Sequence, residues 1–141
     1  NNALGVISIE ESAKLYRGLL PAFRAGLVMA AHDISDGGFA AAAAEMAFGG
    51  SLGADLSSET GYAQDGISQA ELLFGESPSR ILLEVDKDSE LAFRSLVAGL
   101  PVERVGFVSS GHDLTLLDGA GRELLREDIA VLLECWSGGE I

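Results

Sequence analysis

Apolar residues near the start of the chain recur at alternating spacings of four and three, which places them on one face of a helix. They are Ile9, Ala13, Tyr16, Leu20, Phe23 and Leu27. Ser8 with Glu11 three positions later predicts where this helix begins, because each side chain can satisfy a free backbone N–H of the first turn. Pro21 is expected to kink or end the helix.

The next segment, residues 27–34, is an apolar run with little alternation, which predicts a strand covered on both faces. A Ser-Asp-Gly-Gly turn then leads into residues 39–48, a strong helix former closed by Gly49 and Gly50. Five consecutive alanines make this predicted helix slim, so it can approach a sheet closely.

The remaining pattern alternates strands and helices. It predicts a strand at 52–56, a polar loop at 57–68, a helical turn at 69–74, a strand at 80–85, a helix at 88–100, a strand at 102–108, strands at 113–117 and 123–125, and a helix at 127–134. The helix at 88–100 should turn Leu91, Leu96, Val97 and Leu100 inward. Asp118 and Gly119 predict a hairpin turn, because Asp-Gly tolerates positive φ.

This order of elements predicts an α+β fold, with a mixed β-sheet covered by helices and an antiparallel hairpin at the end. The 141 residues contain no internal repeat and no interdomain linker. We therefore expect residues 1–141 to form one domain.

Charge and cysteine content narrow the function. Asp and Glu number 22 against 9 Lys and Arg, so the field of the chain should repel nucleic acid and anionic membranes. No apolar stretch reaches the roughly 20 residues needed to span a bilayer.

The single Cys135 cannot form an internal disulfide, fits a reducing cytoplasm and is expected to be a small buried hydrophobe. A phosphate ligand stays open, since backbone N–H groups or a metal can hold it.

The first candidate site is the segment that runs from His32 to Gly38. A buried strand feeds a glycine turn that opens a helix, which points free N–H groups at an anion. Asp33 and Asp36 disfavour a bare phosphate but suit Mg²⁺, which takes carboxylate and phosphate oxygens together. In the alternative interpretation, Ser35 or Asp36 only caps the helix and the glycines only permit the turn.

The second candidate site is the segment 73–80, Leu-Phe-Gly-Glu-Ser-Pro-Ser-Arg. A glycine, two hydroxyls and a guanidinium could hold a phosphate or a ribose. The residues concerned are Glu76, Ser77, Ser79 and Arg80. The alternative is structural: Pro78 fixes a turn, the serines bond locally, and Glu76 pairs with Arg80 at the surface.

No self-contained catalytic apparatus is visible. His32 beside an apolar strand is expected to be a hydrogen-bonded structural residue, because no nucleophile lies near it in a known pattern. The chain has no Walker-type glycine loop, nucleophile elbow or metalloprotease motif. We therefore predict no catalytic residue within these residues.

Three segments in order resemble the C-terminal synthetase domain of the phosphoribosylformylglycinamidine synthase family, within the aminoimidazole ribonucleotide synthetase superfamily. Residues 32–38 match its His-Asp-x-Ser-Asp-Gly-Gly pattern, 44–47 its Ala-Glu-Met-Ala helix and 50–54 its Gly-x-x-Gly-Ala strand. The segment 73–80 is similar to the form found in stand-alone synthetase subunits of bacteria and archaea. The resemblance extends from about residue 8 to residue 108.

The resemblance implies a C-terminal domain of a longer ATP-dependent ligase of purine biosynthesis. That family converts formylglycinamide ribonucleotide, ATP and glutamine-derived ammonia to the amidine. It further implies that Asp33 contacts Mg²⁺ and that Ser35 contacts a nucleotide, at a site that can be auxiliary rather than catalytic. From the turn itself, we expect Asp36, Gly37 and Gly38 to bind nucleotide or phosphate together with Ser35.

The family's ATP-binding domain and catalytic histidine lie upstream, so the resemblance implies that ATP binds together with that missing domain and that this chain alone is inactive. Its implied partners are the upstream domain and a glutaminase component, and a homodimer is also expected. Two alternatives remain open: a domain of a thiamine-monophosphate-kinase-like relative, and a non-catalytic binding module of the same superfamily.

Overall fold

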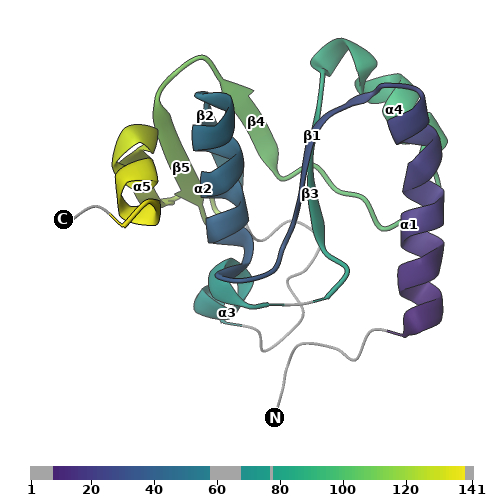
Figure 1. Cartoon of the computed structure of the whole chain (residues 1–141), viewed down its shortest axis with the longest axis horizontal. Coiled ribbons are helices and arrows are strands. Elements are labelled where there is room, and N and C mark those ends of the chain that lie inside the picture. Colours follow the sequence, from purple (N-terminus) through teal and green to yellow (C-terminus); the bar gives the residue numbers. More distant parts are fainter. Residues whose placement is uncertain (1–7, 58–67, 77, 139–141) are drawn as a thin grey trace.

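The computed structural model describes residues 8–57, 68–76 and 78–138 (Figure 1). The elements in chain order are α1 (Ile9–Arg24), β1 (Val28–Asp33), α2 (Gly38–Gly50), β2 (Gly53–Ser57), α3 (Gln69–Phe74), β3 (Ile81–Val85), the 3-10 helix η1 (Lys87–Ser89), α4 (Glu90–Leu96), β4 (Gly106–Ser109), β5 (Asp113–Leu117), β6 (Glu123–Asp128) and α5 (Ile129–Trp136). The type and order of the predicted helices and strands are confirmed. Most of the loop predicted at 57–68 lies outside the described residues, and Ser57 belongs to β2. The strand predicted at 102–108 is shorter and begins at Gly106.

The described strands form two sheets. β1 and β3 make an antiparallel pair, and the other four strands lie in the order β4-β2-β5-β6. The four-stranded sheet is mixed, because β2 runs parallel to β5 while β4 and β6 are antiparallel to their neighbours. The predicted α+β class with a helix-covered mixed sheet is therefore confirmed.

The larger core surrounds α2, which contacts both sheets and α5 (Figure 1). Its alanines provide the close approach that the sequence predicts: Ala42 and Ala43 are 2% exposed. Leu114 and Leu116 of β5 face them and are equally buried. Small side chains on the helix thus meet large ones on the sheet.

The smaller core joins α1, α4 and β3. Its buried members are Leu19, Ala22, Phe93 and Val97. The apolar stripe recognised in the sequence lies largely outside it, since Ile9, Tyr16, Leu20 and Phe23 are exposed. Helix α1 has two adjacent apolar faces, and the face of Leu19 and Ala22 is the one that packs.

Three local predictions need correction. In α4, Leu91 and Leu96 point outward whereas Phe93 is buried, because the helix runs only from Glu90 to Leu96 and packs through Phe93 on α1. Cys135 is exposed, because α5 packs only one side against the larger core. The positive φ of the hairpin turn belongs to Gly121 rather than to Gly119.

Both ends of the described chain are fixed by side-chain contacts. Ser8 and Glu11 form the predicted capping box, and Pro21 lies inside α1 without ending it. Trp136 packs against Phe48 of α2, with ring centroids 5.6 Å apart. This contact fastens α5 to the larger core.

Candidate functional site

The Ser-Asp-Gly-Gly turn joins the end of β1 to the start of α2. Gly37 is the N-cap of α2 with φ 77°, and Gly38 has φ 70°. The Gly38 N–H donates to the Ser35 carbonyl at 2.9 Å, and no side chain caps the helix. The interpretation of Ser35 or Asp36 as a mere helix cap is therefore wrong, and both residues are exposed.

Gly38 is required by its surroundings as well as by its backbone conformation. A Cβ at this position would lie 2.6 Å from the carbonyl carbon of Phe74 and 2.8 Å from the carbonyl oxygen of Leu73. Only glycine permits this approach of the turn to the end of α3. The close contact brings the second candidate segment, which follows α3, beside the turn.

The two candidate segments meet through Glu76. Its Oε1 accepts a hydrogen bond from the Gly37 N–H at 3.1 Å, so a carboxylate engages this amide of the turn. The Ile34 N–H donates to the Arg80 carbonyl at 2.9 Å, which joins the segments a second time. In the structural alternative, Glu76 pairs with Arg80 at the surface. In the structure, the Glu76 side chain instead links its segment to the glycine turn.

Ser79 connects this segment to α1. Its Oγ lies 2.6 Å from Ser12 Oγ, and its φ of 64° is left-handed. Arg80 is half-buried directly before β3. Ser77, the remaining member of the second candidate site, lies outside the described residues.

His32 is a hydrogen-bonded structural residue, as predicted. Its Nδ1 lies 2.6 Å from the Asp33 carbonyl oxygen, and its Nε2 lies 2.9 Å from Glu45 Oε2 on α2. The hydrogen bond to the Asp33 carbonyl raises the pKa of His32 above its ordinary value, and Glu45 adds to this rise while burial opposes it. Sequence reasoning missed Glu45, which lies in an alanine-rich helix with no spacing signal.

Whether the turn can bind Mg²⁺ depends on which oxygen ligands it offers. The Asp33 side chain is 75% exposed at the end of β1, so its oxygens are accessible. Over the described ranges, no group of three or more His, Cys, Asp or Glu side chains could hold a metal ion. Mg²⁺ commonly takes one or two carboxylates and completes its shell with phosphates and water. Asp33 therefore fits as one ligand of a phosphate-bound ion, and it does not form a separate metal centre.

An apolar pocket of about 330 Å³ opens beside the turn. It is lined by Tyr16, Leu19, Leu20, Phe23, Ala31, His32, Asp33 and Ile81. Its aromatic side chains, Tyr16 and Phe23, come from the outer stripe of α1. Sequence reasoning missed this pocket, because periodicity alone does not separate a core face from a pocket face.

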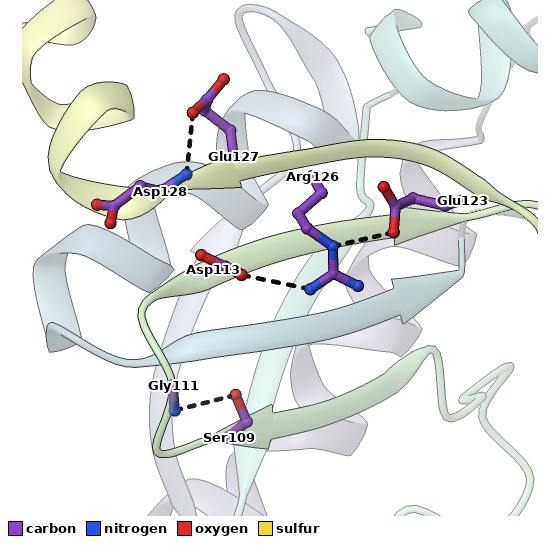
Figure 2. Close-up of polar contacts among 7 residues, drawn as sticks. All are labelled: Ser109, Gly111, Asp113, Glu123, Arg126, Glu127 and Asp128. Atoms are coloured by element: carbon purple, nitrogen blue, oxygen red, sulfur yellow. Dashed lines mark hydrogen bonds and ion pairs between the residues drawn. The ribbon is translucent and has the colours of Figure 1, made fainter.

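A separate group of charges lies on β5 and β6 (Figure 2). Arg126 donates to Glu123 at 2.9 Å and to Asp113 at 3.3 Å, and these bonds raise its pKa. All three side chains are substantially exposed. Exposed pairs of this kind contribute little stability.

The fold and the glycine turn define a class of protein. Residues 9–119 match the family model described as AIR synthase related protein, C-terminal domain. The chain belongs to this family. No helix in the part that the structure describes is long and apolar enough to cross a membrane.

Within this family the chain is homologous to PurL, the phosphoribosylformylglycinamidine synthase subunit. It is 34% identical over 134 residues to that subunit from Thermoanaerobacter sp. (strain X514) and 35% identical over 137 residues to that of Caldanaerobacter subterraneus. Each match covers 94% of this chain and 17% of the relative. The chain therefore spans about a sixth of the length of these relatives.

Solved structures support the same fold. The PurLQS structure from Thermotoga maritima has a TM-score of 0.79 at 18% identity, covering 92% of this chain and 23% of that one. T. maritima PurL complexed with ADP has a TM-score of 0.77 at 19% identity, covering 91% and 22%. A HypE–HypF complex matches at a TM-score of 0.65 and 15% identity, covering 82% and 40%. The fold thus extends beyond PurL.

Proposed function

We propose that this chain is the C-terminal domain of a cytoplasmic PurL-type ligase. The enzyme would convert formylglycinamide ribonucleotide, ATP and glutamine-derived ammonia to formylglycinamidine ribonucleotide in purine biosynthesis. The observation that carries the proposal is the junction of the acidic glycine turn with the segment after α3, where Glu76 meets Gly37. Structures of T. maritima PurL complexed with ATP and with FGAR support the substrate class.

The residues of the turn have distinct roles in this proposal. Asp33 provides one carboxylate oxygen to a phosphate-bound Mg²⁺, and Ser35 provides a hydroxyl to the nucleotide. Asp36, Gly37 and Gly38 complete the turn around the phosphates. The metal, when bound, neutralises phosphate charge that the surrounding carboxylates would otherwise repel.

The second segment completes the proposed site. The hydrogen bonds of the Glu76 side chain and of the Arg80 carbonyl join this segment to the turn. We propose that Glu76, Ser79 and Arg80 contact the substrate or its phosphate. Ser77 is proposed with them from the sequence alone. None of these residues is assigned a catalytic step, so the chain by itself should form no amidine.

The activity is proposed for a larger assembly. The outer face of α1, with Tyr16, Leu20 and Phe23 exposed, supports docking of another domain or a second copy of the chain. We propose the upstream ATP-binding domain and a glutaminase component as partners, the latter supported by the T. maritima PurLQS structure.

Sedimentation of the isolated chain should detect dimers, and a strict monomer at high concentration would contradict self-association.

The decisive experiment compares Asp33→Asn, Ser35→Ala and the unmodified protein in the full natural chain that carries these residues. Calorimetric titration with Mg-ADP should show the largest loss of affinity for Asp33→Asn, a smaller loss for Ser35→Ala, and melting temperatures close to that of the unmodified protein. Unchanged affinity and stoichiometry in Asp33→Asn would remove Asp33 from the site.

Asp55→Asn is the matched control. Asp55 is an exposed aspartate on β2, so this change removes one negative charge away from the turn. It should leave Mg-ADP affinity unchanged. An equal loss in Asp33→Asn and Asp55→Asn would mean that affinity responds to net charge rather than to a carboxylate at the turn.

A further inference from the structure

His32 contacts the turn without belonging to the proposed ligand set. It lies on β1 directly before Asp33, and its side chain is 28% exposed. A carbonyl oxygen can only accept a hydrogen bond, so the 2.6 Å contact from Nδ1 to the Asp33 carbonyl places a hydrogen on Nδ1. With Nε2 held by Glu45, neither ring nitrogen is available as a ligand or a base unless a hydrogen bond breaks.

The peptide group between Asp33 and Ile34 is hydrogen-bonded on both sides. Its carbonyl oxygen accepts from His32, and its N–H, which belongs to Ile34, donates to the Arg80 carbonyl at 2.9 Å. Ile34 itself is 7% exposed and fixed in the larger core. The backbone at Asp33 therefore has one orientation, and its carboxylate projects outward from it.

We propose that His32 is a positioning residue that sets the direction of the Asp33 carboxylate through the Nδ1 hydrogen bond, while Glu45 anchors the imidazole ring on α2. This inference rests on the proposed function, because the aligned carboxylate is the proposed ligand of phosphate-bound Mg²⁺. Removing a group that orients a metal ligand commonly lowers the metal affinity by about 10- to 100-fold.

The two nitrogens of His32 have separable effects. The Nδ1 contact is local and aligns Asp33, whereas the Nε2 contact joins β1 to α2 and so contributes to stability. Asparagine places its side-chain amide nitrogen near the position of Nδ1, and glutamine places its amide near Nε2. His32→Asn thus retains the contact with the Asp33 carbonyl, and His32→Gln retains the contact with Glu45.

The test measures melting temperature and Mg-ADP affinity for both variants in the full natural chain. His32→Gln should keep its melting temperature and lose Mg-ADP affinity by about 10-fold. His32→Asn should melt earlier and keep its affinity within about twofold, since the local contact with Asp33 survives. Glu45→Gln keeps an acceptor opposite Nε2 and is the conservative control, with both quantities expected to stay close to those of the unmodified protein.

The possible failures are distinguishable. If the unmodified protein binds no Mg-ADP, the proposed function fails and the positioning role fails with it. If it binds and His32→Gln binds equally well, only the positioning role is overturned. If His32→Gln does not fold, His32→Asn decides, because a tenfold loss of affinity in that variant contradicts the role given to Nδ1.

Discussion

The two cores of this chain differ in the side chains that their helices contribute. Around α2, alanines allow the helix to lie close to its neighbours, and Ala42 and Ala43 are almost completely buried. Between α1 and α4, a few large residues such as Phe93 fill the space. The first core should be sensitive to added volume and the second to lost volume, because native packing leaves few voids.

A large effect on stability is expected where the α2 region approaches another backbone. Gly38→Val places a β-branched residue at φ 70°, against the backbone of Phe74. Backbone strain and overpacking together should destabilise the fold by roughly 3 to 5 kcal/mol. Thermal unfolding followed by circular dichroism measures the loss.

Gly49→Ala is the control for that change. Gly49 lies in the last turns of the same helix, and a Cβ there would meet nothing within 4 Å. Replacing it should stabilise α2 by roughly 0.5 to 1 kcal/mol. Equal melting temperatures for the two variants would show that the turn does not need glycine.

In the smaller core, loss of volume should dominate. Phe93→Ala is expected to lower stability by about 3 to 5 kcal/mol, since Phe93 is 5% exposed and packs between α1 and α4. Denaturant unfolding gives the value. Leu91 lies on the outward face of α4 and is 81% exposed. Leu91→Ala should therefore change the free energy of unfolding by less than about 0.5 kcal/mol.

In the larger core, added volume is the informative change. Ala42→Leu should cost roughly 1 to 3 kcal/mol, because the helix cannot move away from both sheets at once. Ala92→Leu adds the same atoms to an exposed position of α4 and should have little effect. Unchanged stability in Ala42→Leu would contradict the expected sensitivity of this core to added volume.

The smallest effect concerns the turn between β5 and β6. Asp118 accepts from the backbone N–H groups of Arg122 and Ala120 and from Arg122 Nε, and the Arg122 backbone bond is the main reason that its pKa is lowered. A lowered carboxyl pKa adds stability above the unfolded value of about 3.9 and loses it as the pH falls below that value. The gap in melting temperature between the unmodified chain and Asp118→Asn should therefore narrow from pH 7 to pH 3; a constant gap would contradict this.

Sequence reasoning identified the elements well because their periodicities are strong and their ends carry specific residues, such as Ser8 at the start of α1. It did not separate the two adjacent apolar faces of α1, and the stripe that it identified is largely not the face that packs. At the candidate site, the turn from Asp33 to Gly38 was recognisable from its glycines and carboxylates. The bond from Glu76 to Gly37 and the pairing of His32 with Glu45 were not, since both depend on tertiary contacts that no local pattern encodes.

The pairing of β5 has a consequence for how the chain reaches its structure. Its contact with β6 is local, joining Leu117 to Glu123, and such hairpins form in roughly 1 to 10 μs. Its contact with β2 joins Asp55 to Thr115, so a much longer loop must close first, at a higher entropic cost. During folding, β2 should therefore remain unpaired after the hairpin has formed. Non-local pairing of this kind slows folding and leaves strand edges open to other chains, so refolding yield should fall as protein concentration rises.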